Sequence, residues 1–371
     1  MTKKQRFITA LQGRVPDMVP VAPLIHHRFA YRVLGRRDWR AIFEVHQMIG
    51  SIHFRGPIGV ELSVSLPEGW GKEVRLIDRT NGREVYEHTL RTPKGILKAR
   101  YVQGMISSDP LCGKWVEYPV KNREDWRIYH LYLQQVLANV RGYNLQQITE
   151  VVETMGEDGV PSVGIANVFG RLGDARGLQG LLLDLYDGPD LLIEIYKTQQ
   201  SIIEKEVKAF LDSPAEVMWY DICWATGCGI SPTFFKRWAL PDAQKVVEMV
   251  RAVPGKYIGF YTLGKIRSFL PMLVDTGVHF IETFEPNQGD ISLREAKQKY
   301  GRQVCVMGNF DCNVLAFGTP EDARRETLRC LEEGMEGGGY VLVTADEVPA
   351  DAKVENLKVM VETAEEYGCY R

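Results

Sequence analysis

The feature that most limits the possible folds of this chain is a pattern that its second half repeats: a short apolar run followed by an amphipathic helical segment. The apolar runs are expected as strands, and they occupy residues 162–166, 217–220, 257–260, 279–281, 304–307 and 340–343. Helical spacing follows each run, most clearly after Thr319, a predicted N-cap with Pro320 at the first helical position. Strict alternation of this kind predicts a parallel sheet.

Two further apolar runs, near Val19 and Ile58, bring the predicted strands to eight. Eight strand–helix units favour an α/β fold of the closed (β/α)8 or TIM-barrel kind over its main rival, an open doubly wound sheet. The first strand is not followed by the Gly-x-Gly-x-x-Gly that holds a dinucleotide in the rival fold. We therefore predict one barrel domain over residues 1–371.

Residues 73–102 interrupt this pattern, because their apolar and polar residues alternate with a period of two, as in β-strands. Asn81-Gly82 lies between two alternating runs, and this dipeptide is the strongest short signal for a β-hairpin. We predict a small antiparallel β-hairpin insertion within the barrel domain, without catalytic residues of its own.

Composition and charge exclude several classes of function. The net charge is -3, and no basic run is interleaved with aromatic residues, so a nucleic-acid partner is not expected. The sequence lacks an apolar stretch long enough for a membrane span or a signal core, which predicts a cytoplasmic protein without membrane contact. Seven cysteines without disulfide spacing indicate a reducing compartment. The close pair Cys223 and Cys228 suits either a metal or redox site or simply a tight loop.

Polar side chains gather at the predicted carboxyl ends of the strands, where a (β/α)8 barrel has its active site. A set of carboxylates with His, Tyr and Arg suits proton transfer or metal binding. Some have structural alternatives, such as helix capping by Asp311 or a turn at Glu347. The set consists of His26, His27, Arg28, Asn167, Arg171, Asp221, Tyr261, Glu282, Glu285, Asn309, Asp311, Asp346 and Glu347.

Several short motifs, taken in order, resemble the uroporphyrinogen decarboxylase superfamily. They include Glu285-Pro286, Gly308-Asn309-Phe310-Asp311, and the run from Gly338 through Glu347-Val348-Pro349 to Glu355-Asn356. The resemblance covers nearly the whole chain and implies a (β/α)8 barrel. That superfamily contains cofactor-free decarboxylases, and methyltransferases that pass a methyl group between a small substrate and a corrinoid protein.

Two departures from the superfamily patterns stand out. The decarboxylase motif Arg-Gln-Ala-Gly-Arg, which binds substrate carboxylates, is replaced here by Ile25-His26-His27-Arg28-Phe29. Thiol-activating methyltransferases carry three zinc ligands, one His and two Cys, where this chain has Tyr261, Leu263 and Asp346. The resemblance therefore implies the methyltransferase-like branch, without zinc at the usual three positions.

We predict demethylation of a small O-methyl or N-methyl substrate onto a Co(I) corrinoid (cobalamin) that a partner protein carries or that binds transiently. An acid must protonate the leaving atom, so the expected catalytic residues are Asp346, Tyr261, Asp221 and His27. Substrate binding is expected from His26, Arg28, Asn167, Arg171, Glu285, Asn309 and Asp311. Two alternatives stay open: decarboxylation of a carboxylate held by Arg28 or Arg171, and a non-catalytic relative that binds a ligand or a corrinoid protein.

Overall fold

The computed structural model describes residues 1–370, without the side chains of residues 55–57, as a mixed α/β fold with two compact units. The first unit contains residues 1–59, residues 145–165 and the described chain from residue 210 onward. The second contains residues 60–144 and 166–209. No helix in the described part of the chain has both the length and the apolar composition that a membrane crossing requires.

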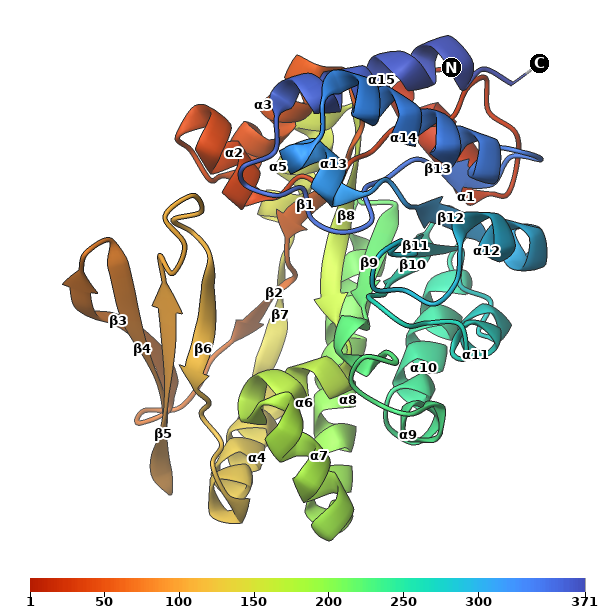
Figure 1. The fold of residues 1–371 in the computed structure, drawn as a ribbon. Helices are drawn as coiled ribbons and strands as arrows, with labels where there is room; N and C mark the ends of the chain where they lie inside the picture. The colour runs from red at the N-terminus through yellow and green to blue at the C-terminus, as the bar shows by residue number, and fades with distance from the viewer. Residues whose placement is uncertain (371) are drawn as a thin grey trace. The chain divides into compact units, whose positions relative to one another are not determined.

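A parallel sheet forms the centre of the first unit. Its seven strands follow the order β1 (His53–Ile58), β8 (Gly159–Ala166), β9 (Val217–Asp221), β10 (Tyr257–Tyr261), β11 (Phe280–Thr283), β12 (Cys305–Gly308) and β13 (Tyr340–Val341). Figure 1 shows β8 to β12 side by side. The pairs from β9 to β13 and the pair β1–β8 are all parallel, as the alternation of strands and helices predicted.

The segment predicted as the first strand is hydrogen-bonded to both edges of this sheet. The Ala22 N–H donates to the Leu342 carbonyl at 2.9 Å, just beyond β13, and the Ile52 N–H donates to the Val21 carbonyl at 2.8 Å, just before β1. Pro20 and Pro23 have no N–H, so the segment makes only scattered bridges instead of a regular strand. The segment links the last strand to the first, which gives a TIM-barrel-like arrangement.

Three helices of the first unit begin at a capping residue, and the helix that follows Thr319 begins where the sequence predicted. α1 (Lys3–Leu11), α3 (Trp39–Ile49) and α14 (Pro320–Gly334) have Thr2, Asp38 and Thr319 as N-caps, and Thr319 forms a capping box with Asp322. Both ends of the described chain lie in this unit (Figure 1), where Met18 bridges to Cys369. The other helices are α2 (His27–Leu34), α5 (Gln146–Met155), α9 (Pro232–Trp238), α10 (Leu240–Arg251), α11 (Leu270–Asp275), α12 (Leu293–Tyr300), α13 (Cys312–Phe317) and α15 (Val354–Tyr367).

Aromatic side chains pack closely inside this unit. Phe7 stacks on Phe54 with ring centroids 4.8 Å apart, and Phe54 meets the edge of Phe280 at 5.6 Å. A Cβ on Gly259 of β10 would lie 1.9 Å from an atom of the Phe280 ring. Glycine is therefore required at position 259 for the two strands to approach.

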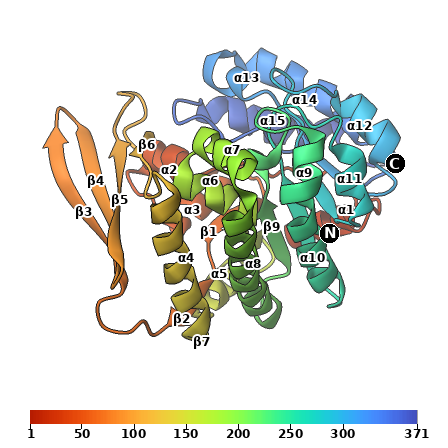
Figure 2. The same cartoon turned by 90° about the horizontal axis from the view of Figure 1, so that it is seen from below.

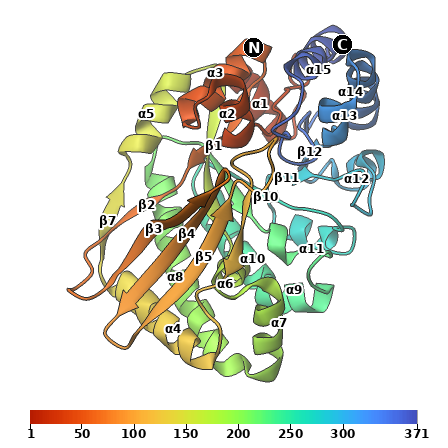
Figure 3. The ribbon, with the colours of Figure 1, turned by 60° about the vertical axis from the view of Figure 1, so that its left-hand side comes forward.

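The second unit contains a four-stranded antiparallel sheet. β3 (Gly71–Thr80) and β4 (Arg83–Thr92) pair across Asn81-Gly82, and the sheet continues through β5 (Gly95–Gln103) and β6 (Gly113–Glu117). Figure 3 shows β3, β4 and β5 side by side, and α4 (Arg123–Ala138) lies against β4 and β5 (Figure 2). The antiparallel region is thus larger than the hairpin expected at residues 73–102. That it is an insertion into a barrel domain stays a prediction.

The structure differs from the sequence expectations in this region. The strand expected around Ile58 ends there. β2 (Glu61–Val64) then pairs antiparallel with β7 (Val140–Asn144), a strand that the sequence pattern did not predict. Val140 and Tyr143 have high strand propensity, and a partner distant in sequence supplies the hydrogen bonds that a local pattern cannot reveal. The remaining helices are α6 (Val168–Arg176), α7 (Leu178–Asp187) and α8 (Pro189–Asp212), whose last residues belong to the first unit.

Candidate active site in the first unit

Tyr261 and Asp346, the two leading catalytic candidates, are in direct contact. Tyr261 ends β10, and its hydroxyl donates a hydrogen bond to Asp346 Oδ1 at 2.6 Å. The same oxygen accepts the N–H of Glu347 at 2.7 Å, which fixes the carboxylate. The Tyr261 ring packs against Trp219 of β9, with centroids 4.6 Å apart, and is only 6% exposed. The ends of three strand segments therefore build one polar site.

Two further carboxylates belong to the same site. Trp219 Nε1 donates to Glu282 Oε2 at 2.7 Å, and Glu282 is fully buried. Glu285 accepts a hydrogen bond from the N–H of Gly264. Burial raises the pKa of Glu285, and the charge of Asp346 raises it further, against the lowering effect of the Gly264 N–H. We call Glu282, Glu285, Asp346 and Glu347 the acidic cluster.

The loop after β10 needs glycine at position 264. Gly264 has φ of +62°, and a Cβ there would lie 2.1 Å from Cys228 Sγ. Because glycine has no Cβ, Cys228 from the loop after β9 can lie against position 264 while the Gly264 N–H bonds Glu285.

Two residues predicted to bind substrate, His26 and Arg28, share one carboxylate. Glu347 lies 3.0 Å from His26 Nδ1 and 3.3 Å from Arg28 Nη1. All three side chains are partly buried, with 22–32% of their surfaces exposed. The positive charge of Arg28 is therefore already countered by the protein.

A turn with unusual backbone angles positions Glu285. Thr283 and Phe284 have φ of 97° and 53°, which residues with a Cβ rarely adopt. The Thr283 hydroxyl donates to the Thr262 carbonyl, and buried Asn309 donates from Nδ2 to the Phe284 carbonyl at 2.7 Å. Arg329 Nη2 in turn donates to Asn309 Oδ1 at 2.9 Å. The contacts of Asn309, predicted to bind substrate, are thus those of a positioning residue.

Three other predicted residues of the first unit take part in local structure. Asp221 Oδ1 accepts the N–H of Cys223 at 2.9 Å in the turn after β9. Asp311 is the N-cap of α13 and also accepts from Asn287 Nδ2 at 2.9 Å. His27 is the first residue of α2, and its side chain is exposed.

Asn167 and Arg171 belong to the second unit. Asn167 is the N-cap of α6, where its Oδ1 accepts the N–H of Gly170 at 2.8 Å. Arg171 forms a bidentate pair with Glu206, with Nη1 3.0 Å from Oε1, and donates from Nε to the Ala166 carbonyl at 3.0 Å. The predicted substrate-binding roles of both residues remain predictions.

Sequence reasoning missed two neighbours of the catalytic pair, Trp219 and Cys312. The Cys312 thiol donates to the Asp346 carbonyl at 3.3 Å, and burial raises the pKa of Cys312 to about 12. The sequence signal for Cys312 was its position directly after Asp311, at the end of the motif Gly308-Asn309-Phe310-Asp311. For Trp219 the signal was strand alternation, because it projects to the opposite face of β9 from Tyr220.

The donor set does not fit the zinc that the resemblance would place at Tyr261, Leu263 and Asp346. The Tyr261 phenol keeps its proton to donate to Asp346, Leu263 has no donor atom, and the adjacent Cys312 is a thiol, whereas zinc binds thiolate. Within residues 1–370, no group of at least three His, Cys, Asp and Glu side chains is arranged to hold a metal ion. The expected absence of zinc from the purified protein stays a prediction.

The family described as Uroporphyrinogen decarboxylase (URO-D) has a model that matches residues 149–367. The chain belongs to this family. The uroporphyrinogen decarboxylase of Neisseria gonorrhoeae (strain NCCP11945) is 26% identical over 196 residues, which are 52% of this chain and 53% of that protein. The one from Chlorobium luteolum is 24% identical over 261 residues, 67% of this chain and 70% of that protein. The match thus spans about half the length of the Neisseria relative.

Among solved structures, a methyltransferase from Methanosarcina mazei resembles this member of the uroporphyrinogen decarboxylase family along its length. The TM-score is 0.66, with 99% of both chains covered and 17% of residues identical. At this level of identity the likeness concerns the fold.

Proposed function

We propose that this family member transfers a methyl group from a small O-methyl or N-methyl compound to a Co(I) corrinoid carried by a partner protein. One observation supports the proposal most directly: the site is rich in carboxylates, and Arg28 and His26 are already paired with one of them, Glu347. The name of the Methanosarcina mazei structure, a methyltransferase with the same fold, agrees with this choice within the family.

The charge of the site favours a substrate without carboxylates. A polycarboxylate such as a porphyrinogen needs cations that the protein leaves available, whereas His26 and Arg28 both face Glu347. Glu282, Glu285 and Asp346 would add repulsion to the extent that they are ionised. A neutral methyl ether or a cationic methylated amine meets no such repulsion.

The chain's own contribution to the reaction is proton supply. As the methyl group passes to the corrinoid, which supplies the nucleophile, the bond between the methyl carbon and oxygen or nitrogen breaks. The bonding pair stays with the heteroatom, and an ether oxygen must then gain a proton. Glu285, with its raised pKa, is a proton donor in the acidic cluster, and the Tyr261 hydroxyl on Asp346 is a second donor.

Incubation of the purified protein with Co(I) cobalamin and a set of methyl donors tests the proposal. Methoxybenzene and trimethylamine represent neutral and cationic donors, and 4-methoxybenzoate is the matched anion. We expect the absorbance change that accompanies corrinoid methylation with at least one of the first two, and a slower change with the anion. Absence of methylation with every donor would contradict the proposal.

Decarboxylation is the second candidate, because the family model and the curated relatives are named for it. In that reaction Arg28 would have to leave Glu347 and hold a substrate carboxylate. Release of CO2 from a porphyrinogen carboxylate by the same preparation, without corrinoid methylation, would establish this candidate. Binding of cobalamin without either reaction would instead indicate a non-catalytic relative.

A further inference from the structure

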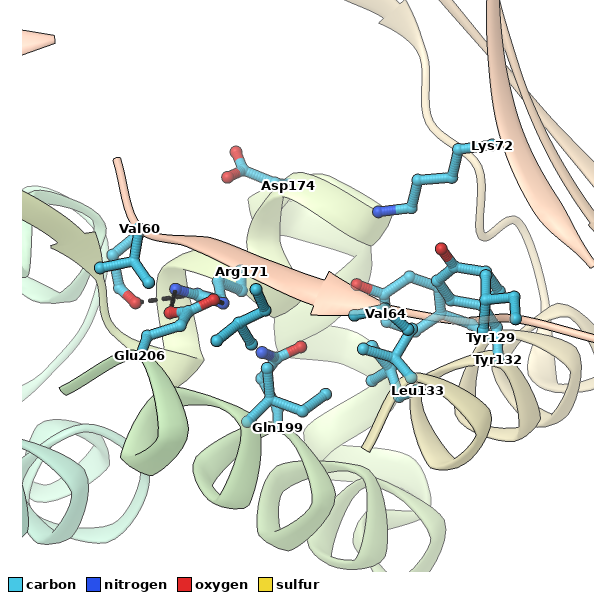
Figure 4. A pocket seen from close by; sticks show the side chains of 15 residues that line it. Val60, Val64, Lys72, Tyr129, Tyr132, Leu133, Arg171, Asp174, Gln199 and Glu206 are labelled. Carbon is cyan, nitrogen blue, oxygen red and sulfur yellow. Dashed lines mark hydrogen bonds and ion pairs between the residues drawn. The ribbon is translucent and has the colours of Figure 1, made fainter. Parts of the chain in front are cut away.

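A pocket of about 520 Å³ lies entirely within the second unit (Figure 4). Residues of β2, α4, α6 and α8 line it, together with Lys72 of β3. Much of the lining is apolar, and none of Tyr261, Glu285 and Asp346 contributes to it. The volume lies in the range of protein sites for small organic molecules. The apolar lining includes Val60, Leu62, Val64, Leu66, Leu133 and Ile202.

A buried amide points into this pocket. Gln199 of α8 is only 3% exposed, and its side-chain amide faces the pocket in Figure 4. Within residues 1–370, no hydrogen bond joins that amide to another protein group. The amide is therefore free to donate or accept a hydrogen bond with a molecule in the pocket.

A cation without a carboxylate partner lies at the same pocket. Lys72 is an exposed residue whose Nζ lies 5.3 Å from the centroid of the Tyr132 ring, and none of the described carboxylates forms an ion pair with it. Loss of hydration lowers the pKa of Lys72, and the positive charge of Arg171 lowers it further. Arg171, in contrast, is held by Glu206, as the dashed lines in Figure 4 show.

Two tyrosines of the lining are suited to donating hydrogen bonds, and two carboxylates, Asp174 and Glu206, also line the pocket, Glu206 being paired with Arg171. Burial raises the pKa of Tyr129 to about 12, and the charge of Asp174 raises it further, against the lowering effect of Arg171. Burial also raises the pKa of Tyr132. Both phenols therefore stay protonated at neutral pH. The pocket thus combines an ammonium group and two hydroxyl groups with an apolar wall.

We propose that this pocket binds a small organic carboxylate with an aliphatic or aromatic body. The carboxylate is held by Lys72 and the tyrosine hydroxyls, the body lies along Leu62 and Val64, and the Gln199 amide bonds a further polar atom. This site goes beyond the proposed methyl transfer and does not depend on it.

Titration calorimetry of the full chain with benzoate, 4-phenylbutanoate and octanoate tests the site, with benzyl alcohol as the uncharged match of benzoate. We expect at least one carboxylate to bind, and Lys72→Gln to weaken its binding about tenfold or more, since hydrogen bonds to charged groups contribute about 1.5–3 kcal/mol. Lys94→Gln, in the turn after β4 of the same sheet, is the matched control and should leave binding unchanged.

A second variant separates the pocket from the candidate active site. Leu62→Trp fills the pocket and should abolish carboxylate binding, whereas Tyr261→Phe should leave it intact; far-UV circular dichroism verifies that each variant is folded. The proposal is overturned if no carboxylate binds, if Lys72→Gln and Lys94→Gln bind equally well, or if Tyr261→Phe removes the binding.

Discussion

At the scale of single residues, the contact between Tyr261 and Asp346 matters most for the proposed chemistry. Tyr261→Phe removes the hydroxyl and keeps the ring that packs on Trp219, and Asp346→Asn keeps an acceptor for the Glu347 N–H. We expect each change to lower turnover with Co(I) cobalamin and a methoxylated donor by about 100- to 10,000-fold, as removal of a proton donor typically does.

The control for this prediction is Glu87→Gln on β4, which alters a surface ion pair with Lys98 and should leave turnover unchanged. Circular dichroism should show all three variants folded. If both Tyr261→Phe and Asp346→Asn turn over like the unchanged protein, the proton does not pass through this pair, and Asp346 serves only to fix its loop.

The raised pKa of Glu285 predicts how activity depends on pH. A carboxyl group that donates a proton must start protonated, so turnover should fall as pH rises through the Glu285 pKa. Glu285→Gln should lower the maximal rate and remove this limb of the pH profile. Steady-state rates of both proteins across the acid and neutral range provide the measurement, and an unchanged limb in Glu285→Gln would assign it to another group.

The same shift has a consequence for stability, with a definite sign. Glu285 binds its proton more tightly in the folded than in the unfolded chain, so the folded state carries more protons between the two pKa values. The free energy of unfolding therefore has its full Glu285 contribution below the unfolded pKa and loses it as pH rises through the folded pKa. In urea titrations at a series of pH values, the free energy of unfolding of Glu285→Gln should fall less over that pH range than that of the unchanged protein.

Sequence patterns located these residues better than they distinguished their roles. Alternation of strands and helices placed Tyr261, Glu285 and Asp346 at strand ends. A polar residue at a strand end, however, can equally cap the next helix, as Asp311 does, or hold a turn, as Asp221 does. Which role applies depends on partners from other strands, such as Trp219, and one sequence does not reveal them.

At the scale of elements, the turn after β11 shows how a buried amide, that of Asn309, can position a site residue that it does not touch. Asn309→Ala removes the bond to the buried Phe284 carbonyl and one of the several acceptors of Arg329, which keeps Glu326 and Glu333. We expect this variant to lose about 1–3 kcal/mol of unfolding free energy, the usual cost of buried groups left unpaired. Turnover should fall as well, because Glu285 follows this turn.

The matched control is Asn313→Ala at the exposed start of α13, where a surface change should stay within about 0.5 kcal/mol. Urea unfolding gives both values. Equal stabilities of Asn309→Ala and Asn313→Ala would show that the turn does not depend on the Asn309 amide.

Elements with strong local signals were the most predictable. The N-cap Thr319 with Pro320 after it located α14, and Asn-Gly located the turn between β3 and β4. β7 was missed, because its pairing with β2 joins residues distant in sequence. Pairing of this kind depends on tertiary contacts, which a local period does not encode.

At the scale of the whole molecule, the sheet of the first unit depends on the segment that joins its last strand to its first. Most of its bonds are between main-chain groups, but the Leu24 N–H donates to a side chain, Thr344 Oγ1, at 2.9 Å. Both residues are buried, so this N–H has no access to water. The Thr344 hydroxyl is therefore expected to support the link between the strands.

Thr344→Val keeps the shape of the side chain and removes the acceptor, so we expect a loss of about 1–3 kcal/mol in unfolding free energy. Thr344→Ser keeps the hydroxyl and loses one methyl group, at a cost of about 1 kcal/mol, so stability alone separates the two variants poorly. Hydrogen exchange of the Leu24 amide separates them better. It should accelerate in Thr344→Val and stay slow in Thr344→Ser if the hydroxyl holds the segment in place, whereas equal exchange in both variants would show that the main-chain bonds at Val21 and Ala22 suffice.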